Sequence, residues 1–141
     1  MNFDFSKEPG KELKKREYEG NIEPLISIIT PFYNSGKYIE QTVNSVLNQT
    51  FPAFELLIID DGSKDKESLE RLKKIEKIDK RIKVFHKQNE GLAATRDYGA
   101  KKASKSSKYL CFLDDDDVVD PTYLECLYFA IETNKKASWA Y

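Results

Sequence analysis

The chain has few cysteines and almost no net charge. Its two cysteines, Cys111 and Cys126, lack the spacing of a metal site, so we expect them to serve packing and to form neither a disulfide nor a metal centre. The 23 basic and 24 acidic residues give a net charge of −1, which offers no general attraction to nucleic acid. We therefore expect no nucleic-acid partner, and any contact with a polyanion must be local.

Long apolar runs are also missing. No stretch reaches the roughly 18 residues of a membrane span, and the first residues lack a basic and then apolar signal pattern. The length of 141 residues suits one domain with a real core. We expect a cytoplasmic location, with association at the inner face of a membrane only through a region beyond Tyr141.

Two regions differ in their sequence pattern. Residues 1–23 carry mixed charge and predict a tail or a short exposed helix without chemistry. In residues 24–141, apolar runs alternate with amphipathic stretches, which indicates an α/β domain. The pattern predicts strands at 26–29, 54–59, 82–85, 109–113 and 137–141, and helices at 37–49, 69–78, 91–104 and 121–135.

The expected fold is an open, mainly parallel, Rossmann-like sheet flanked by helices. Because right-handed crossovers make parallel strands end at the same edge, the residues that close each strand should gather along one rim, where open α/β sheets bind ligands. These residues are Thr30, Asp60, Asp61, His86 and the four aspartates at 114–117. We expect no role for His86.

The four aspartates follow an apolar run, 109–113, that predicts a strand buried on both faces. Carboxylates about 6 Å apart repel by roughly 2 to 3 kcal/mol per pair at an effective dielectric near 20, so an ordered row favours a cation or open water. One interpretation is a solvated turn, with Asp120 as the cap and Pro121 as the first residue of the next helix. Another is a calcium loop, which fits poorly because Val118 and Val119 occupy a ligand position and the turn glycine position. The last is a metal–diphosphate site of the Asp-x-Asp kind.

Other candidate ligand groups lie on the neighbouring loops. Asp61 begins a turn that is either a simple cap or part of a second acidic cluster at the rim. The segment 89–91 precedes a helix whose N–H groups should point at the rim, and Arg96 lies within reach of a phosphate or a base. The alternative for Arg96 is a surface salt bridge with Asp97 or its neighbours.

Several segments together resemble the family 2 glycosyltransferases of the GT-A fold. The resemblance covers about residues 24–141, and the set is specific although each member is not. The segments are 27–34, 45–50, 55–63, 89–91 with Arg96 and Asp97, and 112–117 with Pro121.

The resemblance implies an enzyme that moves a sugar, with inversion, from a nucleotide-sugar donor to a glycan or lipid-linked acceptor in surface polysaccharide synthesis. The donor would be a UDP-sugar bound with Mn²⁺ or Mg²⁺. Asp61 would contact the uracil, Asp114 would lie near the ribose, and Asp116 would bind the metal. The full set of nucleotide-binding residues implied is Thr30, Pro31, Tyr33, Asp61, Arg96, Asp114 and Asp115.

The sequence departs from the family pattern in two respects. The family commonly has Ala-Arg-Asn where this chain has Thr95-Arg96-Asp97, so an acid replaces an amide. The family also places its catalytic base and acceptor half beyond the position of Tyr141, which implies a donor-binding part that transfers no sugar alone. The rival function is a nucleotide-binding module without transferase activity. A phospho-accepting receiver domain is disfavoured, because the first strand ends in Thr30 and Pro31 and not in an acid pair.

Overall fold

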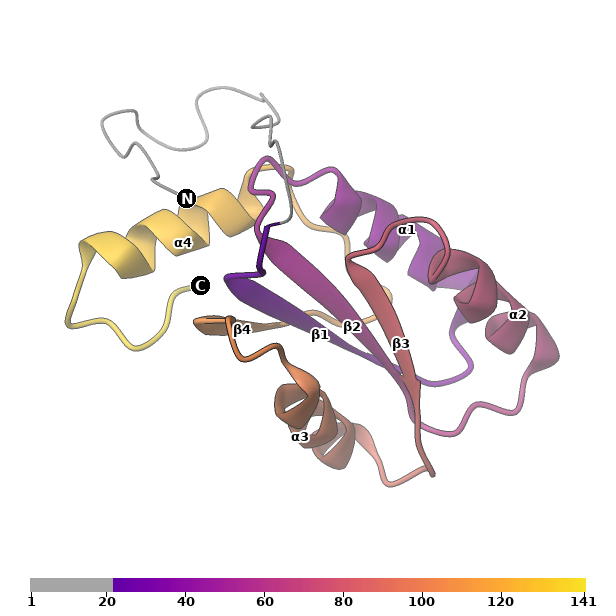
Figure 1. The fold of residues 1–141 in the computed structure, drawn as a ribbon. Coiled ribbons are helices and arrows are strands. Elements are labelled where there is room, and N and C mark those ends of the chain that lie inside the picture. Colours follow the sequence, from indigo (N-terminus) through magenta and orange to yellow (C-terminus); the bar gives the residue numbers. More distant parts are fainter. Residues whose placement is uncertain (1–21) are drawn as a thin grey trace.

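The computed structural model describes residues 22–141, so the prediction of a tail or helix at 1–23 lies outside the described residues. A parallel sheet of four strands in the order β3-β2-β1-β4 has α1, α2 and α4 on one face and α3 on the other (Figure 1). This arrangement confirms the predicted α/β class. The elements are β1 (Ile26–Phe32), α1 (Gly36–Leu47), β2 (Phe54–Asp60), α2 (Lys66–Ile75), β3 (Ile82–His86), α3 (Leu92–Lys102), β4 (Tyr109–Phe112) and α4 (Tyr123–Thr133).

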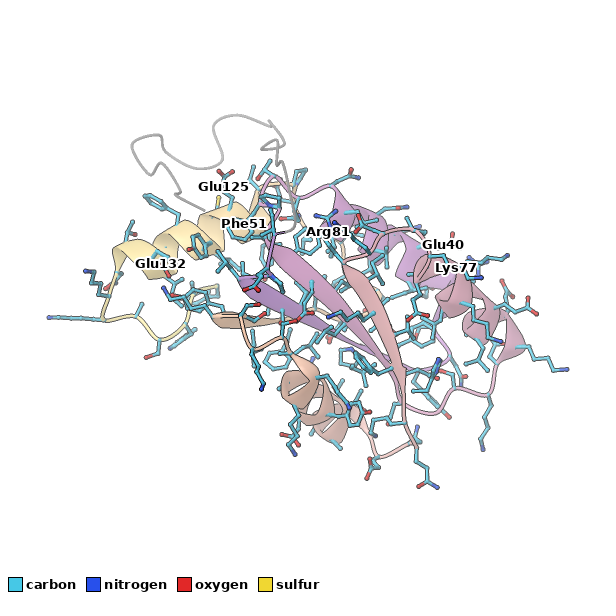
Figure 2. The ribbon with its side chains drawn as sticks, in the orientation of Figure 1. Glu40, Phe51, Lys77, Arg81, Glu125 and Glu132 are labelled. Atoms are coloured by element: carbon cyan, nitrogen blue, oxygen red, sulfur yellow. The ribbon has the colours of Figure 1, made fainter. Side chains whose placement is uncertain are left out.

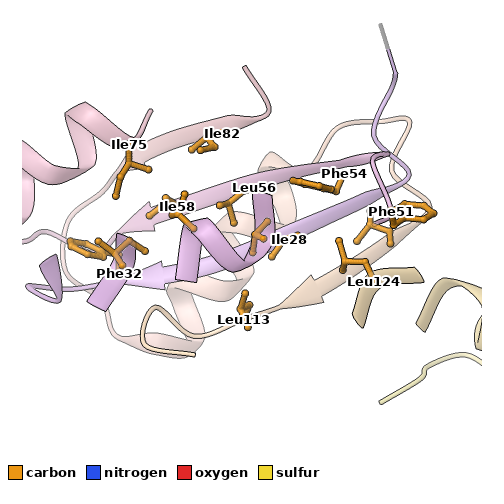
Figure 3. Packing of buried hydrophobic residues seen from close by; sticks show 14 of the residues in the cluster. Ile28, Phe32, Phe51, Phe54, Leu56, Ile58, Ile75, Ile82, Leu113 and Leu124 are labelled. Carbon is orange, nitrogen blue, oxygen red and sulfur yellow. The ribbon is translucent and has the colours of Figure 1, made fainter. Parts of the chain in front are cut away.

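The two central strands, β1 and β2, are buried at every residue, as their nearly continuous apolar sequences predict. A large apolar cluster lies on the face that carries α1 and α2 and includes Ile28, Phe32 and Leu56 (Figure 3). A smaller cluster on the α3 face contains Ile29, Leu57 and Ile59. The sheet therefore lies between two packed apolar layers, one on each face.

Gly99 sets the close approach of α3 to the sheet. A Cβ atom at this position would lie 2.4 Å from Cγ2 of Ile29 and 3.1 Å from Cγ1 of Ile59. No real Cβ atom tolerates the shorter distance, so only glycine fits here without a shift of the helix. The missing side chain therefore lets α3 pack directly on β1 and β2.

The helix α4 packs on the connection between α1 and β2. The ring centroids of Phe51 and Tyr128 lie 4.8 Å apart, and the Thr50 hydroxyl donates to the Glu125 carboxylate at 2.9 Å. Figure 2 shows Phe51 and Glu125 together near the start of this helix. Among residues 22–141, none of the helices has the length and apolar content that crossing a bilayer requires.

The strand β4 corrects one prediction. Leu110 and Phe112 are 46% and 47% exposed, so the expectation of a strand buried on both faces is wrong. The reason is that β4 is an edge strand, and α3 packs over β1 and β2 and leaves this side of β4 open. Tyr109 and Cys111 point to the other face and contact the large cluster.

The C-terminal region corrects two further predictions. The helix begins at Tyr123 after Thr122, not at Pro121, because the Asp120 carboxylate accepts from the Thr122 N–H at 2.8 Å in a separate turn. Residues 137–141 do not form a strand, since within the described residues they pair with no other strand. Both cysteines are free thiols.

Candidate functional site

The carboxyl ends of the strands gather along one rim, as predicted. The Asp61 N–H donates to the Phe32 carbonyl and the Lys87 N–H to the Asp60 carbonyl, each at 2.9 Å. These bonds continue the parallel ladders past the strand ends and align the loops after β1, β2 and β3. The His86 ring nitrogen Nδ1 lies 2.8 Å from Asp60 Oδ2, which ties β3 to β2 at the same edge.

A pocket of about 280 Å³ opens at this rim. Four of the residues proposed from the sequence line it, namely Pro31, Tyr33, Asp61 and Asp115. The other lining residues are Phe32, Ser35, Asn89, Gly91, Leu92 and Thr95. The pocket therefore joins the loops after β1, β2, β3 and β4 into one concave surface.

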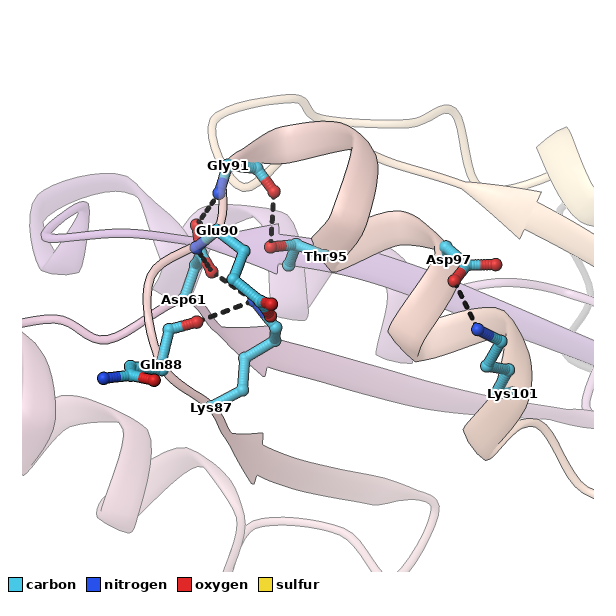
Figure 4. A network of polar contacts seen from close by, with 8 residues as sticks. All are labelled: Asp61, Lys87, Gln88, Glu90, Gly91, Thr95, Asp97 and Lys101. Carbon is cyan, nitrogen blue, oxygen red and sulfur yellow. Dashed lines mark hydrogen bonds and ion pairs between the residues drawn. The ribbon is translucent and has the colours of Figure 1, made fainter.

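Asp61 lies at the pocket with its side chain only 8% exposed. Its Oδ1 accepts from the Lys87 ammonium at 2.7 Å and from the Glu90 N–H at 3.0 Å, and its Oδ2 accepts from the Gly91 N–H at 2.9 Å (Figure 4). Gly91 permits this contact because it adopts a φ of 89° at the start of α3. Burial raises the pKa of the Asp61 carboxyl, but Lys87 and the two N–H groups outweigh it and hold this pKa below its usual value.

Thr30 has a different environment from the pocket residues. Its side chain is fully buried, and its hydroxyl has no hydrogen-bond partner among the described residues. Thr30 pairs with Ile58 in the sheet and does not line the pocket. Its predicted contact with a nucleotide stays a prediction.

Arg96 forms an ion pair, but not with its neighbour in sequence. Its Nη2 lies 2.6 Å from Asp114 Oδ1, whereas Asp97 pairs with Lys101 at 2.6 Å on the outer face of α3. The Nε of Arg96 is buried and has no hydrogen-bond partner among the described residues. Arg96 thus brings a guanidinium with a spare donor to the same edge of the sheet.

The four aspartates at 114–117 form a turn and do not continue β4. The Asp117 N–H donates to the Asp114 carbonyl at 3.3 Å, and the Thr42 hydroxyl donates to the Asp115 carbonyl at 2.9 Å. Burial raises the pKa of the Asp115 carboxyl above its usual value; a contact with the Ser35 hydroxyl offsets part of this, and the charge of Asp116 adds to it. Asp116 and Asp117 are exposed to solvent.

The acidic turn does not form a closed metal site. Within residues 22–141, no three His, Cys, Asp or Glu side chains gather in a group that could hold a metal ion. A single exposed carboxylate such as Asp116 nevertheless fits Mg²⁺ or Mn²⁺ chemistry when a bound diphosphate supplies further oxygen ligands. The donor set of this chain is therefore compatible with a cation that enters with its ligand.

The sequence interpretation missed several residues of this site. Lys87 carries no sequence signal for a site, because a lysine after a strand is usually a solvated surface charge, yet its side chain is only 7% exposed. Leu92 lies in a segment whose pattern predicts only a helix, and it is 53% exposed at the pocket. Only their position in the sequence could have indicated a role in the site, because both residues lie in the loop and first helical turn that follow β3.

Comparisons with known proteins agree on one family. A family model described as glycosyl transferase family 2 matches residues 27–140. The putative teichuronic acid biosynthesis glycosyltransferase TuaG of Bacillus subtilis is 45% identical over 98 residues, which are 69% of this chain and 38% of that protein. The chain spans between 15% and 40% of the length of the first curated relatives that it matches.

Solved structures give the same architecture. The crystal structure of S. aureus TarS 1-349 in complex with UDP-GlcNAc superposes with a TM-score of 0.69 and 31% identity, over 78% of this chain and 32% of that one. A mannosyltransferase of Pyrobaculum calidifontis, solved with GDP-Man and Mn²⁺, has a TM-score of 0.67 over 89% of this chain and 36% of that one. Its identity is 14%, so it supports the fold alone.

Proposed function

The chain belongs to glycosyl transferase family 2, and we propose that it binds the UDP-sugar donor of an inverting sugar transfer in surface polysaccharide synthesis. The observation that carries this proposal is the buried, ionised Asp61 at the wall of a pocket on the carboxyl edge of a GT-A sheet. The complex of TarS with UDP-GlcNAc supports the class of donor. The name of TuaG supports the class of product.

The proposed base site uses one polar and two apolar contacts. Asp61 Oδ2 accepts a single N–H from Gly91, so it retains capacity for the ring N–H of a uracil. Tyr33 and Leu92 are 48% and 53% exposed at the same pocket and offer apolar surface to the faces of a flat base. A base held in this way would be read by hydrogen bonding at its edge and by packing on its faces.

The proposed ribose and diphosphate contacts lie next to the pocket. Asp114 is placed to accept from a ribose hydroxyl, and the Arg96 guanidinium, whose Nη2 pairs with Asp114, brings positive charge for the diphosphate or the base. Pro31 and Asp115 complete the walls of the pocket. For Thr30 we propose a nucleotide contact through the backbone alone, because its side chain is fully buried.

We propose Asp116 as the ligand of Mn²⁺ or Mg²⁺. The bound cation would supply positive charge that stabilises the diphosphate as it leaves. Asp116 suits this role because it is exposed beside Asp115, a wall of the pocket, and the pairing of Asp114 with Arg96 leaves that acid less available. The catalytic base and the acceptor contacts are proposed to lie outside these 141 residues.

A second candidate function is a nucleotide-binding module that transfers no sugar. This function is favoured because, among the described residues, the carboxylates closest to the pocket are all assigned to the donor or the metal. None of them is left to act as a general base. The general base of a transferase must instead reach the attacking hydroxyl within about 3 Å. Release of UDP from UDP-sugars by a protein that contains this domain would identify the enzyme.

Calorimetric titration of the 141-residue chain with UDP, GDP and dTDP, with and without Mn²⁺, tests the proposal. We expect UDP to bind most tightly and Mn²⁺ to strengthen its binding. In an Asp61→Asn variant the amide N–H groups would face the uracil N–H, so UDP affinity should fall by about 10-fold or more, while that for inorganic diphosphate changes little. No binding of any nucleotide in the presence of Mn²⁺ would refute the proposal.

A further inference from the structure

We infer that Lys87 is a positioning residue that makes the pocket select bases with a ring N–H over bases with a bare ring nitrogen. The inference rests on the proposed function, because it assumes that Asp61 faces the nucleotide base. It adds a residue that does not line the pocket and therefore acts through another group.

Lys87 is held in one place by three acceptors. Its ammonium lies 2.7 Å from Asp61 Oδ1, 2.7 Å from the Gln88 carbonyl and 2.8 Å from Glu90 Oε2 (Figure 4). A lysine ammonium has three N–H donors, and each has a partner here. Because its side chain is only 7% exposed, the charge of Lys87 is buried against Asp61 and is poorly screened by water.

The two oxygens of Asp61 are used unequally. Oδ1 accepts both Lys87 and the Glu90 N–H, whereas Oδ2 accepts only the Gly91 N–H. The Thr95 hydroxyl lies near this carboxylate too, but its one hydrogen is donated to the Gly91 carbonyl at 2.8 Å. Lys87 thus occupies one oxygen of Asp61, and an acceptor position remains on the other.

Other charged or titratable groups surround this pair. Glu90 lies on the loop after β3, Asp60 and His86 lie at the adjacent strand ends, Asp115 and Tyr33 line the pocket, and Arg96 projects from α3 toward Asp114. Among the described residues, Lys87 alone of the basic side chains forms a hydrogen bond or ion pair with Asp61. Removing its charge would leave Asp61 buried with two backbone N–H donors and no cationic partner, which shifts the carboxyl toward its protonated form.

The protonation state of Asp61 decides which bases fit. Uracil presents a ring N–H at position 3, whereas cytosine presents a bare nitrogen acceptor there. An ionised carboxylate can only accept, and a protonated one can also donate. With Lys87 present, Asp61 stays ionised and should bind uracil and reject cytosine. Without Lys87, lowering the pH should weaken the preference for uracil over cytosine.

The test compares UDP with CDP, at constant Mn²⁺, from about pH 5.5 to about pH 8. The ratio of the two affinities is the readout, because the diphosphate titrates equally in both ligands. Binding is measured for the wild type, Lys87→Met, Lys87→Gln and Lys87→Arg. Lys87→Gln keeps an N–H donor without the charge, so it maintains the fold if Lys87→Met does not.

We expect the UDP preference of the wild type and of Lys87→Arg to stay nearly constant over this range. In Lys87→Met and Lys87→Gln it should fall about tenfold as the pH is lowered, while Lys101→Met, which removes the exposed partner of Asp97, matches the wild type. Equal losses of UDP and CDP binding at every pH in the Lys87 variants would overturn this inference alone. Failure of the wild type to bind UDP would overturn the proposed function with it.

Discussion

The Arg96 guanidinium lies 2.6 Å from the Asp114 carboxylate and joins α3 to the acidic turn that follows β4. The two side chains are 36% and 46% exposed, so the pair itself contributes about 1 kcal/mol or less to stability. Its position is more important, because a diphosphate at this edge would otherwise meet uncompensated acids at 114–117. Arg96 therefore offsets negative charge where an anion is proposed to bind.

Replacement of Arg96 should weaken nucleotide binding more than it weakens the fold. For Arg96→Ala we expect UDP affinity to fall by about 10-fold or more, because a charge-assisted hydrogen bond is lost. The unfolding free energy should change by about 1 kcal/mol or less. Lys101→Ala, which breaks the exposed pair with Asp97, is the matched control and should leave affinity within about twofold. Equal effects of the two substitutions would contradict the role given to Arg96.

Asp116→Asn should remove the dependence of UDP binding on Mn²⁺. An amide is a poor ligand for a hard cation compared with a carboxylate, while its size is the same. Calorimetry of UDP binding with and without Mn²⁺ measures the effect. Asp117→Asn changes the adjacent exposed acid and serves as the control. If Asp117→Asn abolished the metal effect and Asp116→Asn did not, the metal ligand would be Asp117.

Gly99→Ala should destabilise the protein despite the better helix propensity of alanine. Propensity alone would favour the variant by about 1 kcal/mol. The new Cβ would lie 2.4 Å from Cγ2 of Ile29, and relief of this overlap costs about 1 to 3 kcal/mol. We expect a net loss of about 1 kcal/mol in chemical denaturation. An increase in stability would show that α3 does not pack this closely on β1.

Glu55 should stabilise the protein at neutral pH and lose this effect in acid. This buried carboxylate accepts from Ser27, Lys83 and the N–H and hydroxyl of Ser104. Burial raises the pKa of Glu55, but these partners hold it below the value that an unfolded chain would show. A depressed folded pKa stabilises the protein above the unfolded pKa, and this contribution is lost as the pH falls through the folded pKa.

A Glu55→Gln variant tests this linkage. It should be less stable at neutral pH by about 1 to 3 kcal/mol, because charged hydrogen bonds are lost and Lys83 is left without its partner. Below about pH 4.3 the difference from the wild type should shrink, since the wild-type carboxyl then gains a proton on unfolding. Denaturation curves at several pH values provide the measurement. A difference that stays constant down to acidic pH would contradict the assignment.

The sequence predicted the central architecture because the buried strands have a simple signature. β1 and β2 lie inside the sheet, and their continuous apolar runs report burial directly. The same signature was misleading for β4, where Leu110 and Phe112 are exposed. A run of apolar residues does not say whether its strand lies at an edge, since that depends on which strands pair.

The placement of the candidate residues along one rim could be predicted from the sequence, but their contacts with one another could not. Topology alone brings Asp61 and Asp115 to one rim, and both line the pocket. The partners of Asp61 could not be read from the sequence, because Lys87 is separated from it by α2 and β3. The pairing of Arg96 with Asp114 in place of Asp97 also required the packing of α3 on the sheet.

The most direct test of the account is to map where UDP binds. Nuclear magnetic resonance of the ¹⁵N-labelled chain, titrated with UDP and diamagnetic Mg²⁺, reports each backbone amide. The account predicts shifts at residues 32–35 and 89–92, including the Gly91 amide that contacts Asp61. A second cavity of about 330 Å³ between β4 and α4, lined by Leu127 and Ile131, should show none. Shifts confined to that cavity, or none at saturating UDP, would contradict the account.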